Sequence, residues 1–151
     1  MVVLKKKFKP VVFIFLIGVL LSFFTVSAFA DSLVSSDETY FSTYGHDYEG
    51  RSFLSIHTSD HTASAGAETG NQLNERVPTG YLAVVARLFN NDDDLIYSTG
   101  FQYSDGPAIA LQVSTDSSTT RTTYYSQAIS GAFNGDGYDY YLVNRTPSLT
   151  N

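Results

Sequence analysis

Residues 123–143 (TYYSQAISGAFNGDGYDYYLV) have the pattern that most narrows what this chain can fold into. Two tyrosine-rich runs with alternating side chains flank the segment 134–137, Asn-Gly-Asp-Gly. Alternation with a period of two is typical of strands, and a short Asn-Gly segment is typical of the tight turn between two antiparallel strands. The pattern therefore predicts a β-hairpin with its turn at 134–137.

Similar runs, alternating or continuously apolar, precede this hairpin and are separated by polar segments rich in glycine and aspartate. They lie at residues 38–44, 51–58, 81–89, 95–103 and 108–113. No amphipathic helix pattern is present, so we expect an all-β domain, an antiparallel β-sandwich of about seven strands, with a small β-barrel as the alternative.

The segments between and beyond these runs are expected to be irregular. Residues 59–76 contain a single large apolar side chain, Leu73, and are predicted to form a long loop. Residues 31–37 and 144–151 are polar and are expected to be a loose leader and a tail. Gly100, inside the run 95–103, is expected to mark a β-bulge.

The first thirty residues have the features of an export signal. Four lysines within residues 5–9 precede an uncharged apolar run, 11–24, and residues 28–30 are Ala-Phe-Ala. A basic start, an apolar centre and a small-x-small end predict a signal peptide, 1–30, that is cleaved before Asp31; an uncleaved membrane anchor is the alternative. We therefore expect one secreted, extracellular domain, residues 31–151, that is free of the membrane after cleavage.

The net charge of the expected domain narrows the classes of partner that it can bind. Residues 31–151 contain five arginines, no lysine and all fifteen acidic residues, a net charge of −10 with neutral histidines. Such a surface repels phosphate backbones and anionic lipids, which argues against nucleic-acid binding. The chain has no cysteine, which excludes disulfides, thiolate metal sites and cysteine nucleophiles.

Several short motifs are shared with a known group of sequences. These are Gly80-Tyr81, residues 86–89 (ARLF), 123–126 (TYYS) and 133–138 (FNGDGY). In their order and spacing over residues 77–149 they resemble small exported proteins of Gram-positive bacteria, an uncharacterised group. The resemblance implies an exported all-β protein, and it carries over no activity and no catalytic residue.

The sequence contains no enzyme signature, and we expect a non-catalytic protein. No Gly-x-Ser-x-Gly segment, which would hold a serine nucleophile on a sharp turn, is present. The alternative is a small extracellular hydrolase. That alternative predicts His46 or His57 beside a carboxylate in a deep pocket, since catalytic triads are defined by geometry and not by sequence order.

One segment has the composition of a calcium site. Asp92, Asp93 and Asp94 are adjacent, and carboxylate oxygens are the ligands that Ca²⁺ prefers. The competing interpretation is a charged turn that keeps a hairpin tip in water. Apart from this calcium site, no cofactor is expected.

The tyrosines of the hairpin predict a binding surface. Strand alternation places Tyr138 and Tyr140 on one face, and we expect Tyr124 to join them. Tyrosine offers a broad ring and a polar edge, which suits contacts with proteins and with sugars. The function expected is therefore an extracellular binding module for a protein or a cell-surface glycan; a secreted antagonistic, bacteriocin-like protein is a further alternative.

Overall fold

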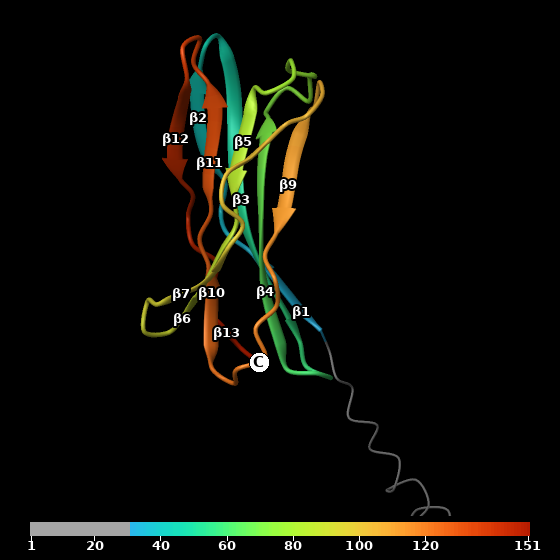
Figure 1. Ribbon diagram of the computed structural model, residues 1–151, viewed down its shortest axis with the longest axis vertical. Coiled ribbons are helices and arrows are strands. Elements are labelled where there is room, and N and C mark those ends of the chain that lie inside the picture. Colours follow the sequence, from blue (N-terminus) through green and yellow to red (C-terminus); the bar gives the residue numbers. More distant parts are fainter. Residues whose placement is uncertain (1–30) are drawn as a thin grey trace, which may run out of the picture.

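The computed structural model describes residues 31–151, and this part of the chain contains strands and no helix. Its thirteen strands form three antiparallel sheets arranged in two layers of an elongated molecule (Figure 1). The prediction of an all-β fold is confirmed. None of the three sheets closes on itself within these residues, so the barrel alternative is not formed. No helix that could span a membrane occurs between residues 31 and 151, and the expected signal peptide lies outside the described residues.

One layer is a single sheet that runs the whole length of the molecule. Its two long central strands, β3 and β4, pair along ten residues, and the shorter strands flank them (Figure 1). Its strands are β1 (Ser32–Ser35), β2 (Thr39–Thr43), β3 (His46–His57), β4 (Thr62–Asn71) and β9 (Ala110–Ser114).

The facing layer is divided into two smaller sheets. At the end near the C-terminus lie β13 (Leu149–Thr150), β10 (Thr123–Ser126), β6 (Arg87–Asn90) and β7 (Leu95–Ser98), paired in that order. At the other end lie β12 (Tyr138–Leu142), β11 (Ile129–Phe133), β5 (Leu82–Val85) and β8 (Gln102–Tyr103). The chain passes between the two sheets at Ala86 and again at Gln127 and Ala128.

The predicted hairpin is confirmed at its turn and corrected at its first strand. β11 and β12 pair across residues 134–137, where Asn134 Oδ1 accepts hydrogen bonds from the backbone N–H groups of Asp136 and Gly137 at 3.1 and 2.8 Å. Gly135 has φ +101°, which favours glycine. Residues 123–126, however, belong to β10 in the other small sheet. The expected strand 81–89 is likewise split, into β5 and β6.

The prediction of a long loop at residues 59–76 is wrong, because residues 62–71 form β4. This strand alternates Ala63, Ala65, Ala67 and Thr69, all buried, with outward-facing polar residues or glycine. Alternation is present, but its inward members are too small to stand out in hydropathy. The expected leader and tail also contain strands, β1 and β13.

The core has large side chains at both ends and small ones in the middle. At the C-terminal end Leu54, Ile56, Leu88 and Tyr124 pack together. At the opposite end the buried cluster contains Phe41, Tyr48, Val77, Leu82 and Ala132. Between them lie Ala67, Val84, Ala86, Ala128 and Val143. Small residues allow the two layers to approach closely at mid-length.

Side-chain hydroxyl groups bond across the two layers at mid-length. We call this region the waist, and it consists of Gly50, Ser52, Thr69, Ala128 and Ser130. Ser52 Oγ accepts the backbone N–H of Ala128 at 2.9 Å, and Thr69 Oγ1 donates to the carbonyl of Ala83 at 2.9 Å. A serine or threonine side chain is too short to bridge the usual separation of about 10 Å between packed sheets. The layers are therefore tied by direct side-chain-to-backbone hydrogen bonds.

Gly50→Ala is expected to destabilise the fold strongly. A Cβ at residue 50 would meet Ser130 Oγ, lie 2.8 Å from Ser130 Cβ and lie 2.9 Å from Val143 Cγ2, all on the facing layer. Overpacking of this kind typically costs about 1–3 kcal/mol. Thermal or urea unfolding measures the effect. Gly106→Ala is the matched control, because a Cβ there has no atom within 4 Å; equal stability of the two variants would contradict a close-packed waist.

Candidate functional site

The outer face of the β12-β11-β5-β8 sheet carries a row of tyrosines over very small residues. Direct cross-strand pairing aligns Tyr140, Gly131, Ala83 and Tyr103 in one row, one from each strand. Directly paired residues point to the same side of a sheet. The two tyrosines stand on the outer strands, and the glycine and the alanine stand between them.

The tyrosine rings lean inward and cover the middle of the sheet. A Cβ at Gly131 would lie 2.6 Å from Tyr140 Cδ1, so the ring occupies the space above this glycine. The hydroxyl oxygens of Tyr103 and Tyr140 lie 3.3 Å apart and share a hydrogen bond. Ala83 beneath them is fully buried, although it faces the outer side. This explains why β5 is buried on both faces, as its continuous apolar sequence predicts.

Further rings extend this row into a surface that we call the aromatic face: Phe101, Tyr103, Phe133, Tyr138 and Tyr140. Ring centroids lie 4.5 Å apart for Phe101 and Tyr140, 4.9 Å for Tyr103 and Tyr138, and 6.1 Å for Phe133 and Tyr138. Phe101, Tyr103 and Tyr140 remain 40%, 45% and 45% exposed. The rings are therefore held by one another and are still open to solvent.

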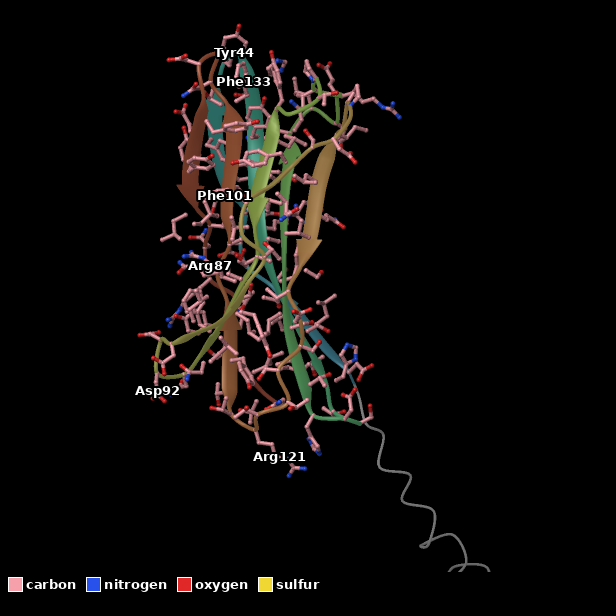
Figure 2. The ribbon with its side chains drawn as sticks, viewed as in Figure 1. Tyr44, Arg87, Asp92, Phe101, Arg121 and Phe133 are labelled. Carbon is pink, nitrogen blue, oxygen red and sulfur yellow. The ribbon has the colours of Figure 1, made fainter. Side chains whose placement is uncertain are left out.

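The aromatic face reaches the tip of the molecule. Phe133 contacts Tyr44, from the β2–β3 turn, at a centroid distance of 5.6 Å. Figure 2 shows Tyr44 and Phe133 at this tip and Phe101 nearer to mid-length. The Tyr138 hydroxyl donates to the carbonyl of Gly80, which fixes the ring in place. The rings thus form an elongated stripe along the sheet.

Two of the three predicted binding tyrosines lie in this surface, and the third does not. Tyr138 and Tyr140 stack at a centroid distance of 5.9 Å. Tyr124, by contrast, is 1% exposed and lies in the core at the other end of the molecule, so its assignment to the surface is wrong. Its hydroxyl lies 2.8 Å from Ser118 Oγ and donates to the carbonyl of Thr120. The split between β10 and β11 separates it from the hairpin.

Phe101 and Tyr103 are functional candidates that the sequence interpretation missed. They lie in the expected strand 95–103, which is interrupted at Thr99 and Gly100, where Gly100 has φ +66°. The β-bulge expected at Gly100 is not formed: β7 ends at Ser98 and β8 begins at Gln102, in a different sheet. After Gly100, the chain joins the other small sheet as β8 and pairs with β5. The sequence shows that Phe101 and Tyr103 alternate along a strand, but it does not show to which sheet that strand belongs.

The three aspartates proposed for calcium lie in the β6–β7 turn, which Asn90 organises. Asn90 Oδ1 accepts the N–H groups of Asp92 and Asp94, each at 2.9 Å, and Asp93 Oδ1 accepts the Tyr125 hydroxyl at 2.8 Å. Figure 2 places Asp92 at the outer end of this hairpin. In residues 31–151 no three acidic or histidine side chains are grouped so as to hold a metal ion. The calcium site stays a prediction.

Comparison with known proteins gives no relative to reason from. No protein-family model matches the chain, and neither a curated protein nor a solved structure is similar to it.

The Tyr103–Tyr140 bond gives a testable pH dependence. This hydrogen bond, burial and the neighbouring phenols of Tyr103 and Tyr138 raise the pKa of Tyr140 from 10.0 to about 12. The folded protein therefore holds this proton more tightly than the unfolded chain. Its contribution to stability is complete below pH 10 and is lost as the pH rises toward 12.

Tyr103→Phe removes the hydrogen bond, so Tyr140 should ionise at a lower pH, and the alkaline loss of stability that Tyr140 causes should shrink. Tyrosinate absorbance and circular dichroism across the alkaline range measure both effects. Tyr97→Phe also removes one tyrosine, outside the aromatic face, and is the matched control. Superimposable titration curves for the two variants would contradict the coupling.

Proposed function

We propose that this protein is a secreted β-sandwich module that binds a neutral cell-surface glycan along its aromatic face. The main observation behind this proposal is the row of rings on the outer face of the sheet. In this row the hydroxyl groups of Tyr103 and Tyr140 share a hydrogen bond above Gly131 and Ala83. Exposed rings supply flat apolar surfaces for the C–H faces of sugars, and the phenol edges supply hydrogen bonds. The tyrosines offer both at once.

The shape of the aromatic face supports a polymer as the ligand. The rings follow the strands from Phe101 to the tip at Tyr44, and each contacts the next. An elongated, shallow surface presents contacts in series, as a chain of sugar units requires. A small molecule would instead be enclosed by a cavity.

Charge supports a neutral ligand. Residues 31–151 carry a net charge of −10 with neutral histidines, so an anionic wall polymer would be repelled at long range. Neutral sugars carry no net charge, so the negative charge of the protein does not repel them. The expected signal peptide and the absence of cysteine are consistent with an extracellular domain held by its core and its strand pairing.

The order in the aromatic face also supports binding. Each ring is already in contact with its neighbours, so a ligand meets side chains with little freedom left to lose. Immobilising a mobile side chain costs about 0.5–1.5 kcal/mol on association, and this surface avoids much of that cost. Gly131 contributes by leaving room for the ring of Tyr140 above its strand.

Removing single rings should weaken binding without unfolding the protein. Tyr140→Ala and Phe101→Ala should each reduce affinity about three- to tenfold, because a well-placed ring contributes about 0.5–1.5 kcal/mol. Titration calorimetry with chito-oligosaccharides and retention on peptidoglycan stripped of protein and anionic polymers measure the loss. Circular dichroism verifies the fold.

Tyr40→Ala is the matched control, since Tyr40 is a 62% exposed tyrosine on β2, in the facing layer. Its affinity should equal that of the unchanged protein. Equal binding by all variants would contradict the aromatic face as the site. If the unchanged protein binds no glycan but is retained by cell walls that still carry their proteins, the partner is a protein instead.

A further inference from the structure

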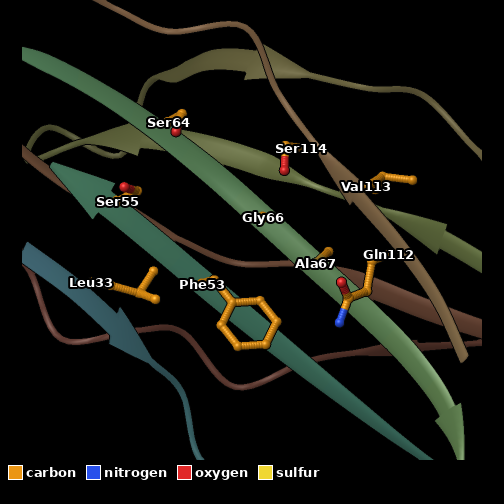
Figure 3. A pocket seen from close by; sticks show the side chains of 9 residues that line it. All are labelled: Leu33, Phe53, Ser55, Ser64, Gly66, Ala67, Gln112, Val113 and Ser114. Carbon is orange, nitrogen blue, oxygen red and sulfur yellow. The ribbon is translucent and has the colours of Figure 1, made fainter. Parts of the chain in front are cut away.

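A concave surface lies on the opposite layer of the molecule from the aromatic face. It is a shallow hollow of about 240 Å³ in the outer face of the sheet formed by β1, β3, β4 and β9 (Figure 3). Its floor and walls combine hydroxyl groups with apolar side chains. They are Leu33, Phe53, Ser55, Ser64, Gly66, Ala67, Gln112, Val113 and Ser114.

The hollow exists because neighbouring outward positions carry small residues. Ser55 pairs with Ser64 across β3 and β4, and Gly66 pairs with Ser114 across β4 and β9. The larger side chain of Phe53 stands beside Gly66, its direct partner on β4. The result is a recess with serine hydroxyls at its base and an aromatic ring at its side.

Ser55 is linked to two further residues, which lie outside the lining of the hollow. Ser55 Oγ lies 3.5 Å from His57 Nε2, and His57 Nδ1 lies 3.2 Å from Asp31 Oδ2. Strand alternation puts Ser55 and His57 on one face of β3, and the pairing of β1 with β3 brings Asp31 next to His57. The order of atoms is that of a serine nucleophile, its base and the carboxylate that orients the base.

We propose that this hollow is an acyl-transfer site that hydrolyses small neutral esters. This goes beyond the binding function proposed above and reverses the expectation of a non-catalytic protein. With Nδ1–H donated to Asp31, the other ring nitrogen of His57 is free to accept a proton from Ser55. The acyl group of the ester enters the recess beside Phe53, where the ring provides an apolar wall.

The reaction balances with water as the only co-reactant. Ser55 Oγ bonds to the acyl carbon while its proton passes to His57 Nε2. The ester C–O bond then breaks, and the departing alcohol takes that proton. Water, losing a proton to Nε2, attacks the acyl carbon and breaks its bond to Ser55 Oγ, which regains a proton as the acid leaves. Asp31 acts as a positioning residue through His57.

The donor to the developing oxyanion is a side chain. β3 lies between β1 and β4, and its backbone is engaged in pairing with both. Ser64 pairs directly with Ser55 and carries its hydroxyl on the same face, and we assign it this role. His57 and Asp31 have side-chain exposures of 46% and 60%, so water screens their interaction. Turnover should therefore be slow and best seen with activated esters.

A fluorophosphonate probe tests the nucleophile directly, because Ser55 Oγ would displace fluoride and keep the phosphonyl group. Intact mass and peptide mapping of the full-length protein should show one adduct, on Ser55. Hydrolysis of p-nitrophenyl acetate should fall roughly 100-fold in His57→Ala, the usual contribution of a positioned general base. Ser55→Ala should lose both the adduct and the hydrolysis above buffer.

Two comparisons separate catalysis from a structural effect. Ser148→Ala changes an exposed serine outside the hollow and should keep labelling and rate. Asp31→Glu should restore the rate that Asp31→Asn loses, since a carboxylate again orients His57. Absence of the adduct, an adduct elsewhere, or hydrolysis by Ser55→Ala at the unchanged rate would overturn the proposal. The last result would assign hydrolysis to an exposed imidazole alone.

Discussion

The hydrogen bond from the Ala128 N–H to Ser52 Oγ, 2.9 Å long and buried, is the interaction on which the arrangement of the layers depends. It lies at the waist, where the chain leaves one small sheet and enters the other. At this point the Ala128 amide is used for bonding to the opposite layer, and the carbonyl of Ala128 accepts the N–H of Val143 at 3.1 Å. Small residues are required around this bond, as the close approach at Gly50 shows. The facing layer is thus two sheets because its strands are tied across the layers at mid-length.

This division explains the aromatic face. The sheet formed by β12, β11, β5 and β8 is short, and its two middle strands carry Gly131 and Ala83 on the outer side. Backbone and small side chains there would be open to water without cover. Tyr140 and Tyr103 provide the cover from the two edge strands and satisfy each other's hydroxyls. The same rings therefore complete the sheet and, in the function proposed above, would present a surface to a ligand. On the opposite layer, Phe53 stands beside Gly66, and a hollow remains beside Ser55 and Ser64.

Local pattern predicted local structure well and long-range structure poorly. The turn at 134–137 follows from turn chemistry and is found. β4 was not predicted because most of its inward residues are alanines. Their burial is determined by a close-packed partner layer and not by their own hydropathy. Tyr124 was misplaced for a related reason. The change of sheet after Ser126 is dictated by the contact of Ala128 with Ser52, 76 residues earlier in the chain, which no local pattern displays.

Hydrogen exchange at the Ala128 amide, compared between the unchanged protein and Ser52→Ala, tests the role of the waist most directly. The account predicts that this amide exchanges only through global unfolding in the unchanged protein, since its partner belongs to the opposite layer. In Ser52→Ala the buried N–H has no acceptor, which costs about 1–3 kcal/mol. Protection should then fall at Ala128 and in both small sheets together. Rapid exchange of Ala128 in the unchanged protein, or unaltered protection in Ser52→Ala, would contradict it.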